Sequence, residues 1–506
     1  MSKQIILTLF FLLSLQSAIF ADVFRYRLYL DGKPDSQQVK FSERALERRQ
    51  RLGIVSDEKD YAVSENYIQQ LREAELTILS SSRWLNTVTV TSGDGSEDIT
   101  EKLSALSYVK KVETLTIAEK TRAVLSHNDL NEQLEVAADV EEDCSAPLRE
   151  VNAYESLYLA GHRGEGVLIA VLDCGYLRLN ECDWLMDKVV FAHNMYDPTH
   201  PESLYVDNSH GLQCMSIMAC PEEQGVCGTA QEAQYCIFST ENSTIESSWE
   251  EDMWVSAAEM ADSIGADLIS SSIGYSVFNN GILSHTQEEL TKNLAIISQG
   301  AKIASQKGLL VVSSAGNYGN KTWQKILFPA DTEEVLSVGA YKTPQEAATF
   351  TGQGFLEPYV KPDVSARGVN CYTINATNSG FKVSSSGSGT SFYTPLIAGL
   401  CASLWSAVPE LTPEELRQVV KESSSDYLSP TIQTGYGLPD FALALKKAQE
   451  MKGYTDIGNI TIEATDAMSA ASKESSCYYN LMGQQVTKPT SRGLYVRDGK
   501  VIQIAE

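Results

Sequence analysis

Residues 167–175, VLIAVLDCG, form a continuous apolar stretch that stops at Asp173. Similar apolar stretches recur along residues 150–450, namely KVVFAHN, QYCIFST, DLISSSI, LLVVSSA and VLSVGA. Helical segments such as WEEDMWVSAAEMADSIG separate several of them. Continuous apolar strands that alternate with helices are typical of a parallel sheet buried on both faces. We therefore predict an α/β domain with a central parallel sheet and helices on both faces.

Polar or small residues lie where three of these apolar stretches stop. Asp173 ends the first stretch, Ser272-Ile273-Gly274 follow the strand that begins DLIS, and Ala315-Gly316-Asn317 follow LLVVSS. In open parallel sheets, ligands bind just beyond the carboxyl ends of the strands. The functional site is therefore expected at this edge of the sheet.

Two further residues stand at the starts of apolar helical stretches. Among the six histidines, only His210, in DNSHGLQCMSIMA, begins such a stretch with a glycine beside it. Ser391, in GSGTSFYTPLIAG (387–399), has the same placement. A serine hydroxyl becomes nucleophilic when imidazole removes its proton, and a carboxylate holds that imidazole in the correct tautomer. Asp173, His210 and Ser391 are therefore the candidate catalytic residues, with the Ser391 N–H and the Asn317 amide as candidate donors to an oxyanion.

Each of these motifs alone also has an ordinary structural explanation. Asp173 could be a helix cap, and Asn317 could be a turn residue with positive φ. The glycines before Ser391 could simply let two elements pack closely. Their joint occurrence at strand ends and helix starts favours an active site. Other enzyme classes lack their motifs here, because the sequence contains no GxSxG elbow, no HExxH and no GxGxxG.

The motifs VLIAVLDCG, NSHGLQCMSIMA, VVSSAGN and GTSFYTPLIAG, in this order, resemble the subtilisin-like serine proteases, or subtilases, over roughly residues 150–447. The resemblance implies a serine endopeptidase that cleaves peptide bonds through an acyl-enzyme. Asp173 would be its orienting acid, His210 its base and Ser391 its nucleophile, with Asn317 and Ser391 forming the oxyanion hole. Segment Ser272-Ile273-Gly274 would pair with the substrate backbone, and Ala315-Gly316 would line the pocket for the residue before the cut. Protein or peptide substrates are implied, and no cofactor or metal ligand is identified.

The sequence departs from the family pattern beside these residues. Cys174 stands where serine or threonine is usual, and Leu212 replaces a common threonine. Phe392, Tyr393 and Leu396 are larger or less polar than expected, and Tyr393 and Leu396 would reshape helix packing or narrow the site. An inactive subtilase fold that acts as a binding or scaffold protein is the alternative, and the intact triad argues against it.

The remaining parts of the chain predict an exported precursor. Residues 1–21 read as a signal peptide, with an apolar run too short to span a bilayer. Residues 22–117 alternate strands and helices and resemble a subtilase propeptide, which acts as an intramolecular inhibitor. Residues 118–149 form an acidic linker, and residues 451–506 form a β tail that resembles sorting modules of secreted Bacteroidetes proteins. The product is expected to be secreted, periplasmic or on the cell surface.

The net charge and the cysteine content limit the possible partners and covalent links of the chain. A formal net charge of −26 argues against nucleic-acid binding, and no segment after the leader is long and apolar enough to span a membrane. Ten cysteines in an exported chain allow disulfides, and either Cys220–Cys227 or Cys174–Cys182 would close a short loop. Cys214 and Cys401 are interpreted as small buried hydrophobes, and EEDMW (250–254) as a solvated helix face.

Overall fold

A computed structural model describes residues 24–92, 97–116, 144–206, 208–242, 245–279, 281–343, 346–367 and 371–454, together with four short C-terminal strands. The chain divides into two compact units, Met1–Ala448 and Gln449–Glu506. The predicted signal peptide and most of the predicted linker lie outside the described residues. Residues 146–149, at the end of that predicted linker, belong instead to helix α5 (Ala146–Glu150).

A central eight-stranded sheet organises the first unit. Its strands follow the order β11-β10-β9-β8-β5-β7-β6, and β12 pairs with β10. All neighbouring strands are parallel except β10 and β11. The strands are β5 (Leu168–Asp173), β6 (Val189–Asn194), β7 (Gln234–Ser239), β8 (Leu268–Ser271), β9 (Leu310–Ser314), β10 (Leu336–Thr343), β11 (Glu346–Ala347) and β12 (Val364–Arg367).

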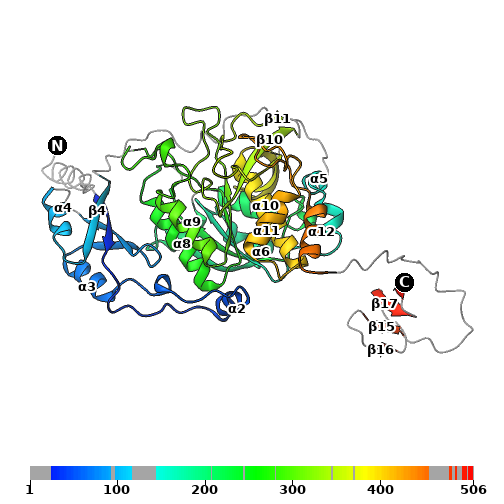
Figure 1. Ribbon diagram of the computed structural model, residues 1–506, viewed down its shortest axis with the longest axis horizontal. Coiled ribbons are helices and arrows are strands. Elements are labelled where there is room, and N and C mark those ends of the chain that lie inside the picture. The colour runs from blue at the N-terminus through cyan, green and yellow to red at the C-terminus, as the bar shows by residue number, and fades with distance from the viewer. Residues whose placement is uncertain are drawn as a thin grey trace, which may run out of the picture. The chain divides into compact units, whose positions relative to one another are not determined.

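Helices cover both faces of this sheet (Figure 1), as predicted. Alternate residues of β5 show why, since side chains of a strand point to opposite faces. Ile169 and Val171 join the core with α7 (His210–Ala219), α10 (Thr390–Ala407), α11 (Pro413–Glu422) and α12 (Phe441–Met451). Leu168, Ala170 and Leu172 join the core with α8 (Glu250–Ile264) and α9 (Ile296–Gln306). The strand is apolar from Leu168 to Leu172 because both of its faces are buried.

The N-terminal part is a small α+β domain with its own core. Its four strands form an antiparallel sheet in the order β2-β3-β1-β4. This core combines residues from the sheet and its helices, including Leu28, Val88 and Leu71. The elements are β1 (Phe24–Leu30), α2 (Glu43–Arg51), α3 (Glu65–Glu73), β2 (Thr77–Ser82), β3 (Thr87–Ser92), α4 (Glu97–Ser104) and β4 (Val109–Thr116).

This N-terminal domain packs on α8 (Figure 1), and the contact is rich in buried ion pairs. Asp262 of α8 is fully buried and receives hydrogen bonds from Arg48, Arg49 and Arg83 of the N-terminal domain. Glu259 accepts hydrogen bonds from the backbone N–H groups of Arg83 and Trp84. Buried charges are tolerated only when they are paired in this way.

The interpretation of EEDMW as a solvated helix face is wrong, because all five residues are buried. Asp252 forms a bidentate pair with Arg27 of β1, at 2.8 and 2.5 Å. Glu250 accepts hydrogen bonds from the backbone N–H groups of Asn242 and Ser247. The polar face of α8 is thus covered by the N-terminal domain and by the loop that enters the helix.

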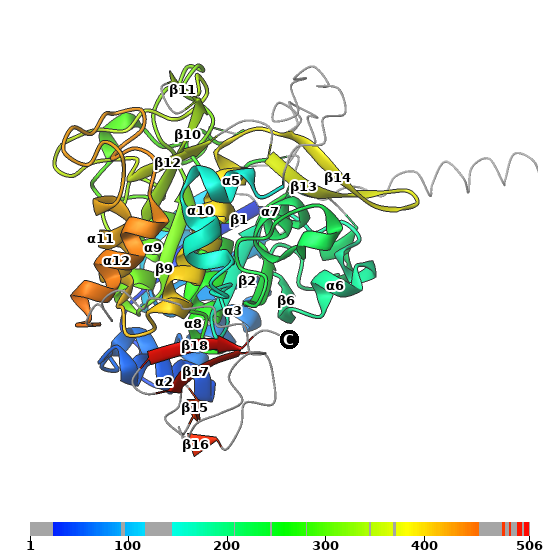
Figure 2. The same cartoon turned by 90° about the vertical axis from the view of Figure 1, so that its right-hand side faces the viewer.

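The hairpin of β13 (Cys371–Thr377) and β14 (Gly380–Gly387) runs beside α7 and leads directly into α10 (Figure 2). At the C-terminal end, β15 (Tyr478–Asn480), β16 (Gln485–Val486), β17 (Gly493–Arg497) and β18 (Lys500–Ile504) form a sheet in the order β16-β15-β17-β18. Within the described residues, none of the helices has the length and apolar character needed to cross a membrane.

Candidate active site

The fold brings the four predicted polar residues to the same edge of the sheet. Asp173 is the last residue of β5, and Asn317 lies three residues beyond the end of β9. His210 is the first residue of α7, and Ser391 is the second residue of α10. Gly389 precedes α10 with a φ of 137°, a conformation that side chains rarely allow, which explains the glycine before the serine.

Asp173 and His210 form a direct pair. Nδ1 of His210 lies 2.7 Å from Oδ1 of Asp173, and the carboxylate is fully buried. The backbone N–H of Cys174 donates to the same oxygen at 2.8 Å. Because the carboxylate faces Nδ1, the ring keeps its proton there and presents Nε2 to the other side. Burial lowers the pKa of His210, but the attraction of the Asp173 carboxylate outweighs it and holds the pKa well above its usual value.

The start of α10, which carries Ser391, lies beside this imidazole. The Phe392 ring, next along the chain, is 5.5 Å from the His210 ring. The carbonyl oxygen of Ser391 accepts hydrogen bonds from Oγ of Ser272 at 2.7 Å and from Sγ of Cys214 at 3.4 Å. The same sulfur lies 4.0 Å from Nε2 of His210. Cys214 and Ser272 therefore bridge the starts of the two helices.

Asn317 is fixed by the first turn of α10. Its Oδ1 accepts hydrogen bonds from the backbone N–H of Thr390 at 2.9 Å and from the Thr390 hydroxyl at 3.0 Å. The carbonyl end of the amide is thus occupied, which leaves Nδ2 as the donor end, beside Gly389. Asn317 and the N-terminus of α10 together offer N–H donors at one place.

The residues predicted to bind substrate are partly engaged inside the protein. Ile273 and Ala315 are buried, and the Ala315 N–H donates to the carbonyl of Val338. Gly274 packs against Leu327, where an added Cβ would come within 2.9 Å of that side chain. Gly316 has a φ of 89° and donates its N–H to the Thr390 hydroxyl.

Sequence reasoning did not assign three of the contacts at this site. Thr390, which orients Asn317, is one residue before the serine and gave no separate signal. Cys214 was interpreted only as a small buried hydrophobe; it is buried, but it also contacts His210 and Ser391. Its spacing was a signal, because residues four apart lie on the same side of a helix. Tyr393 and Leu396 belong to α10 and are buried in the main core.

Two side-chain clusters among the described residues have the composition of a metal site. Asp173, His210 and Cys214 form the first, but the carboxylate and imidazole already bond to each other, and burial raises the pKa of the Cys214 thiol. Metal binding needs a thiolate and open lone pairs, so this cluster is better suited to proton transfer. The second cluster, Cys144, Glu222 and Cys227, lies outside this site.

Comparison with known proteins identifies the family of this chain. The subtilase family model matches residues 164–438, and a model of the Bacteroidota peptidase S8 propeptide domain matches residues 25–129. The chain is 28% identical over 293 residues to serine protease AprX of Bacillus subtilis (strain 168), which covers 52% of this chain and 62% of that protein. It is 26% identical over 281 residues to subtilisin DY of Bacillus licheniformis, which covers 55% of this chain and 90% of the relative. The match to AprX thus spans less than two thirds of that relative's length.

Solved structures show the same fold. A crystal structure of the epidermin leader peptide processing serine protease of Staphylococcus aureus superposes with a TM-score of 0.56 at 15% identity, over 84% of this chain and 99% of that one. A second crystal structure of that protein gives a TM-score of 0.54.

Proposed function

This chain belongs to the subtilase family of serine proteases, and we propose that it is an exported endopeptidase that hydrolyses peptide bonds through an acyl-enzyme on Ser391. The observation that carries the proposal is the 2.7 Å contact between a fully buried Asp173 carboxylate and His210 Nδ1, directly beside the start of α10. A buried carboxylate that orients an imidazole next to a serine is the arrangement that activates a hydroxyl.

In the proposed mechanism, Nε2 of His210 accepts the hydroxyl proton of Ser391 as its Oγ attacks the substrate carbonyl carbon. The imidazolium is stabilised by Asp173. The oxyanion accepts hydrogen bonds from the Ser391 N–H and from Nδ2 of Asn317, which Thr390 holds in place. His210 then gives its proton to the leaving amine. In the second step His210 accepts a proton from a water molecule that attacks the acyl-enzyme, and the carboxylic acid is released from Ser391.

We further propose that the chain is made as a precursor whose N-terminal domain inhibits the enzyme until it is removed. The ion pairs of Asp262 and Asp252 with arginines of that domain support this role, because they hold it on α8 before any cleavage. Cleavage is placed between this domain and the catalytic domain, within residues 117–143, and export would follow from the leader at residues 1–21.

A fluorophosphonate probe tests the proposed activity, because only an activated serine reacts with it. We expect a single labelled site, at Ser391, in the matured protein. A Ser391→Ala variant should remain unlabelled. A folded, matured wild-type protein without any label would instead support the inactive scaffold.

Asn317→Ala is expected to lower kcat by about 10²–10³-fold with little change in KM, because it removes a donor used only by the oxyanion. Steady-state kinetics on a peptide substrate would measure this. Asn317→Asp is the matched variant, since it keeps an oxygen for the Thr390 N–H but replaces the NH2 donor with a charged carboxylate oxygen, and it should lower kcat at least as much. An unchanged kcat in Asn317→Asp would remove Asn317 from the oxyanion hole.

Asp262→Ala is expected to destabilise the uncleaved precursor by about 3–5 kcal/mol, because it leaves the buried Arg48 charge without its carboxylate partner and removes one of two partners from Arg49 and Arg83. The matured protein lacks Arg48, Arg49 and Arg83 and should lose much less stability. Thermal unfolding of both forms would show this difference. Glu65→Gln in the N-terminal domain is a control for the loss of an ion pair in the precursor, and it should cost little stability because the Glu65–Arg72 pair is exposed. Equal losses in the two forms would argue against this interface.

A further inference from the structure

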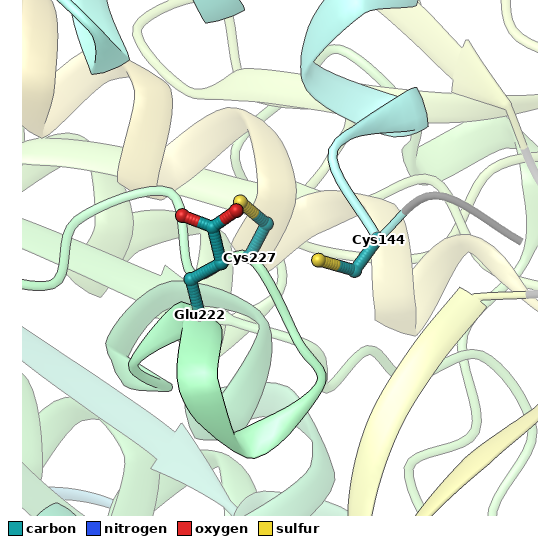
Figure 3. Close-up of side chains that lie close together, drawn as sticks. All are labelled: Cys144, Glu222 and Cys227. Carbon is teal, nitrogen blue, oxygen red and sulfur yellow. The ribbon is translucent and has the colours of Figure 1, made fainter.

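Two cysteines far apart in the sequence meet at the beginning of the catalytic domain. Cys144 lies two residues before α5, and Cys227 lies in the loop between α7 and β7. Their sulfur atoms and a carboxylate oxygen of Glu222 all lie within 4.8 Å of one another. Figure 3 shows the Cys144 sulfur pointing toward the side chains of Glu222 and Cys227.

The surroundings of this cluster suit a covalent bond between the sulfurs better than a metal ion. Oε2 of Glu222 already accepts a hydrogen bond from the Tyr158 hydroxyl at 3.0 Å. The cluster offers three donors, whereas a structural zinc site uses four. Cys227 is 4% exposed, and burial raises the pKa of its thiol to about 12, which disfavours the lasting thiolate of a metal site, whereas a disulfide needs the thiolate only while the bond forms. A disulfide is neutral and is easily buried at such a position.

We propose that Cys144 and Cys227 form a disulfide that fastens the start of the catalytic domain to the loop after α7. The oxidant is a disulfide, either glutathione disulfide or a protein disulfide of the export compartment. The Cys144 thiolate attacks one sulfur of this oxidant and releases a thiol. The Cys227 thiol loses its proton, attacks the Cys144 sulfur of the mixed disulfide and releases the second thiol. In total, two protein thiols lose two electrons and two protons, and the oxidant becomes two thiols.

The position of Cys144 gives this bond a structural purpose. Cys144 directly follows residues 117–143, where we place the maturation cleavage. Leu148 of α5 is buried in the main core, so the new N-terminal segment must stay docked after cleavage. A bond at Cys144 would hold that segment in place. The loop that it closes, residues 144–227, contains β5, β6 and α7 and therefore also Asp173 and His210.

The first test maps the bond chemically. The full chain, carrying Ser391→Ala so that it stays intact, is equilibrated with oxidised glutathione, alkylated under denaturing conditions and digested for mass spectrometry. We expect one linked pair of peptides, containing Cys144 and Cys227, that separates on reduction. The fully buried Cys401 should be alkylated as a thiol. Separate alkylation of Cys144 and Cys227, a Cys220–Cys227 link, or one bound zinc per chain would overturn the proposal.

The second test measures stability. Closing a loop of this length raises the free energy of unfolding, so reduction of the disulfide should lower the Tm by about 5–10 °C. Cys144→Ser, Cys227→Ser and the double variant should show the same drop and no further response to reductant. Cys220→Ser is the matched control and should keep the reductant response. A full response in Cys144→Ser would contradict the bond. Neither test uses activity, so its outcome is independent of the proposed function.

Discussion

Replacement of Ser391 by alanine is expected to lower kcat by about 10⁶-fold and to leave the precursor uncleaved. The hydroxyl is the proposed nucleophile, and without it the Asp173–His210 pair has no proton to remove. Residual hydrolysis would come only from water held near the oxyanion donors. Kinetics on a peptide substrate would measure the first effect, and the mass of the purified full chain would measure the second.

Two controls make this result specific. Ser403→Ala removes a hydroxyl from the same helix, where it donates to the carbonyl of Thr229 away from the site, and should keep activity. Addition of a trace of mature wild-type enzyme to the Ser391→Ala precursor should then cut it, because the cleavage site is still present. Normal self-processing of Ser391→Ala would mean that another protease matures the chain, and normal peptidase activity would exclude Ser391 as the nucleophile.

Much of the fold and of the candidate site could be predicted because the signals are local. The β5 strand is apolar from Leu168 to Leu172 because both faces are buried, and its last residue, Asp173, ends that pattern. His210 and Ser391 lie at the starts of apolar helices, next to glycines, so a short stretch of sequence is enough to place each of them. Parallel strands bring such ends to one edge, which is why residues more than two hundred positions apart could be grouped.

The burial of α8 and the approach of Cys144 to Cys227 depend on contacts with segments far away in the sequence. A short stretch of sequence does not contain that information. The acidic start of α8 has the composition of a solvated face, yet Arg27 of the N-terminal domain pairs with Asp252 and buries it. The approach of Cys144 to Cys227 likewise follows from how α5 docks on the core. Sequence spacing favoured Cys220–Cys227 and Cys174–Cys182 instead, because those pairs are close along the chain.

Replacement of Asp173 by asparagine is expected to lower kcat/KM by about 10⁴-fold. An asparagine amide would donate to Nδ1 of His210, so the ring proton would move to Nε2, where a base is needed. The pH profile should change as well. In the wild type the Asp173 carboxylate raises the pKa of His210 against the effect of burial, so kcat/KM should rise with pH through an inflection above the ordinary histidine value.

Without that carboxylate the largest interaction that raises the pKa of His210 is lost, and burial favours the neutral ring, so the inflection should move to lower pH. The pH dependence of kcat/KM in both proteins would measure the shift. Asp331→Asn is a matched control, because Asp331 is equally buried but bonds to Ser298 and Thr291 instead of a histidine. That variant should lose stability without moving the inflection. An inflection that stays at the same pH in Asp173→Asn would mean that the carboxylate does not set the protonation of His210, and the proposed base would then have to be sought elsewhere.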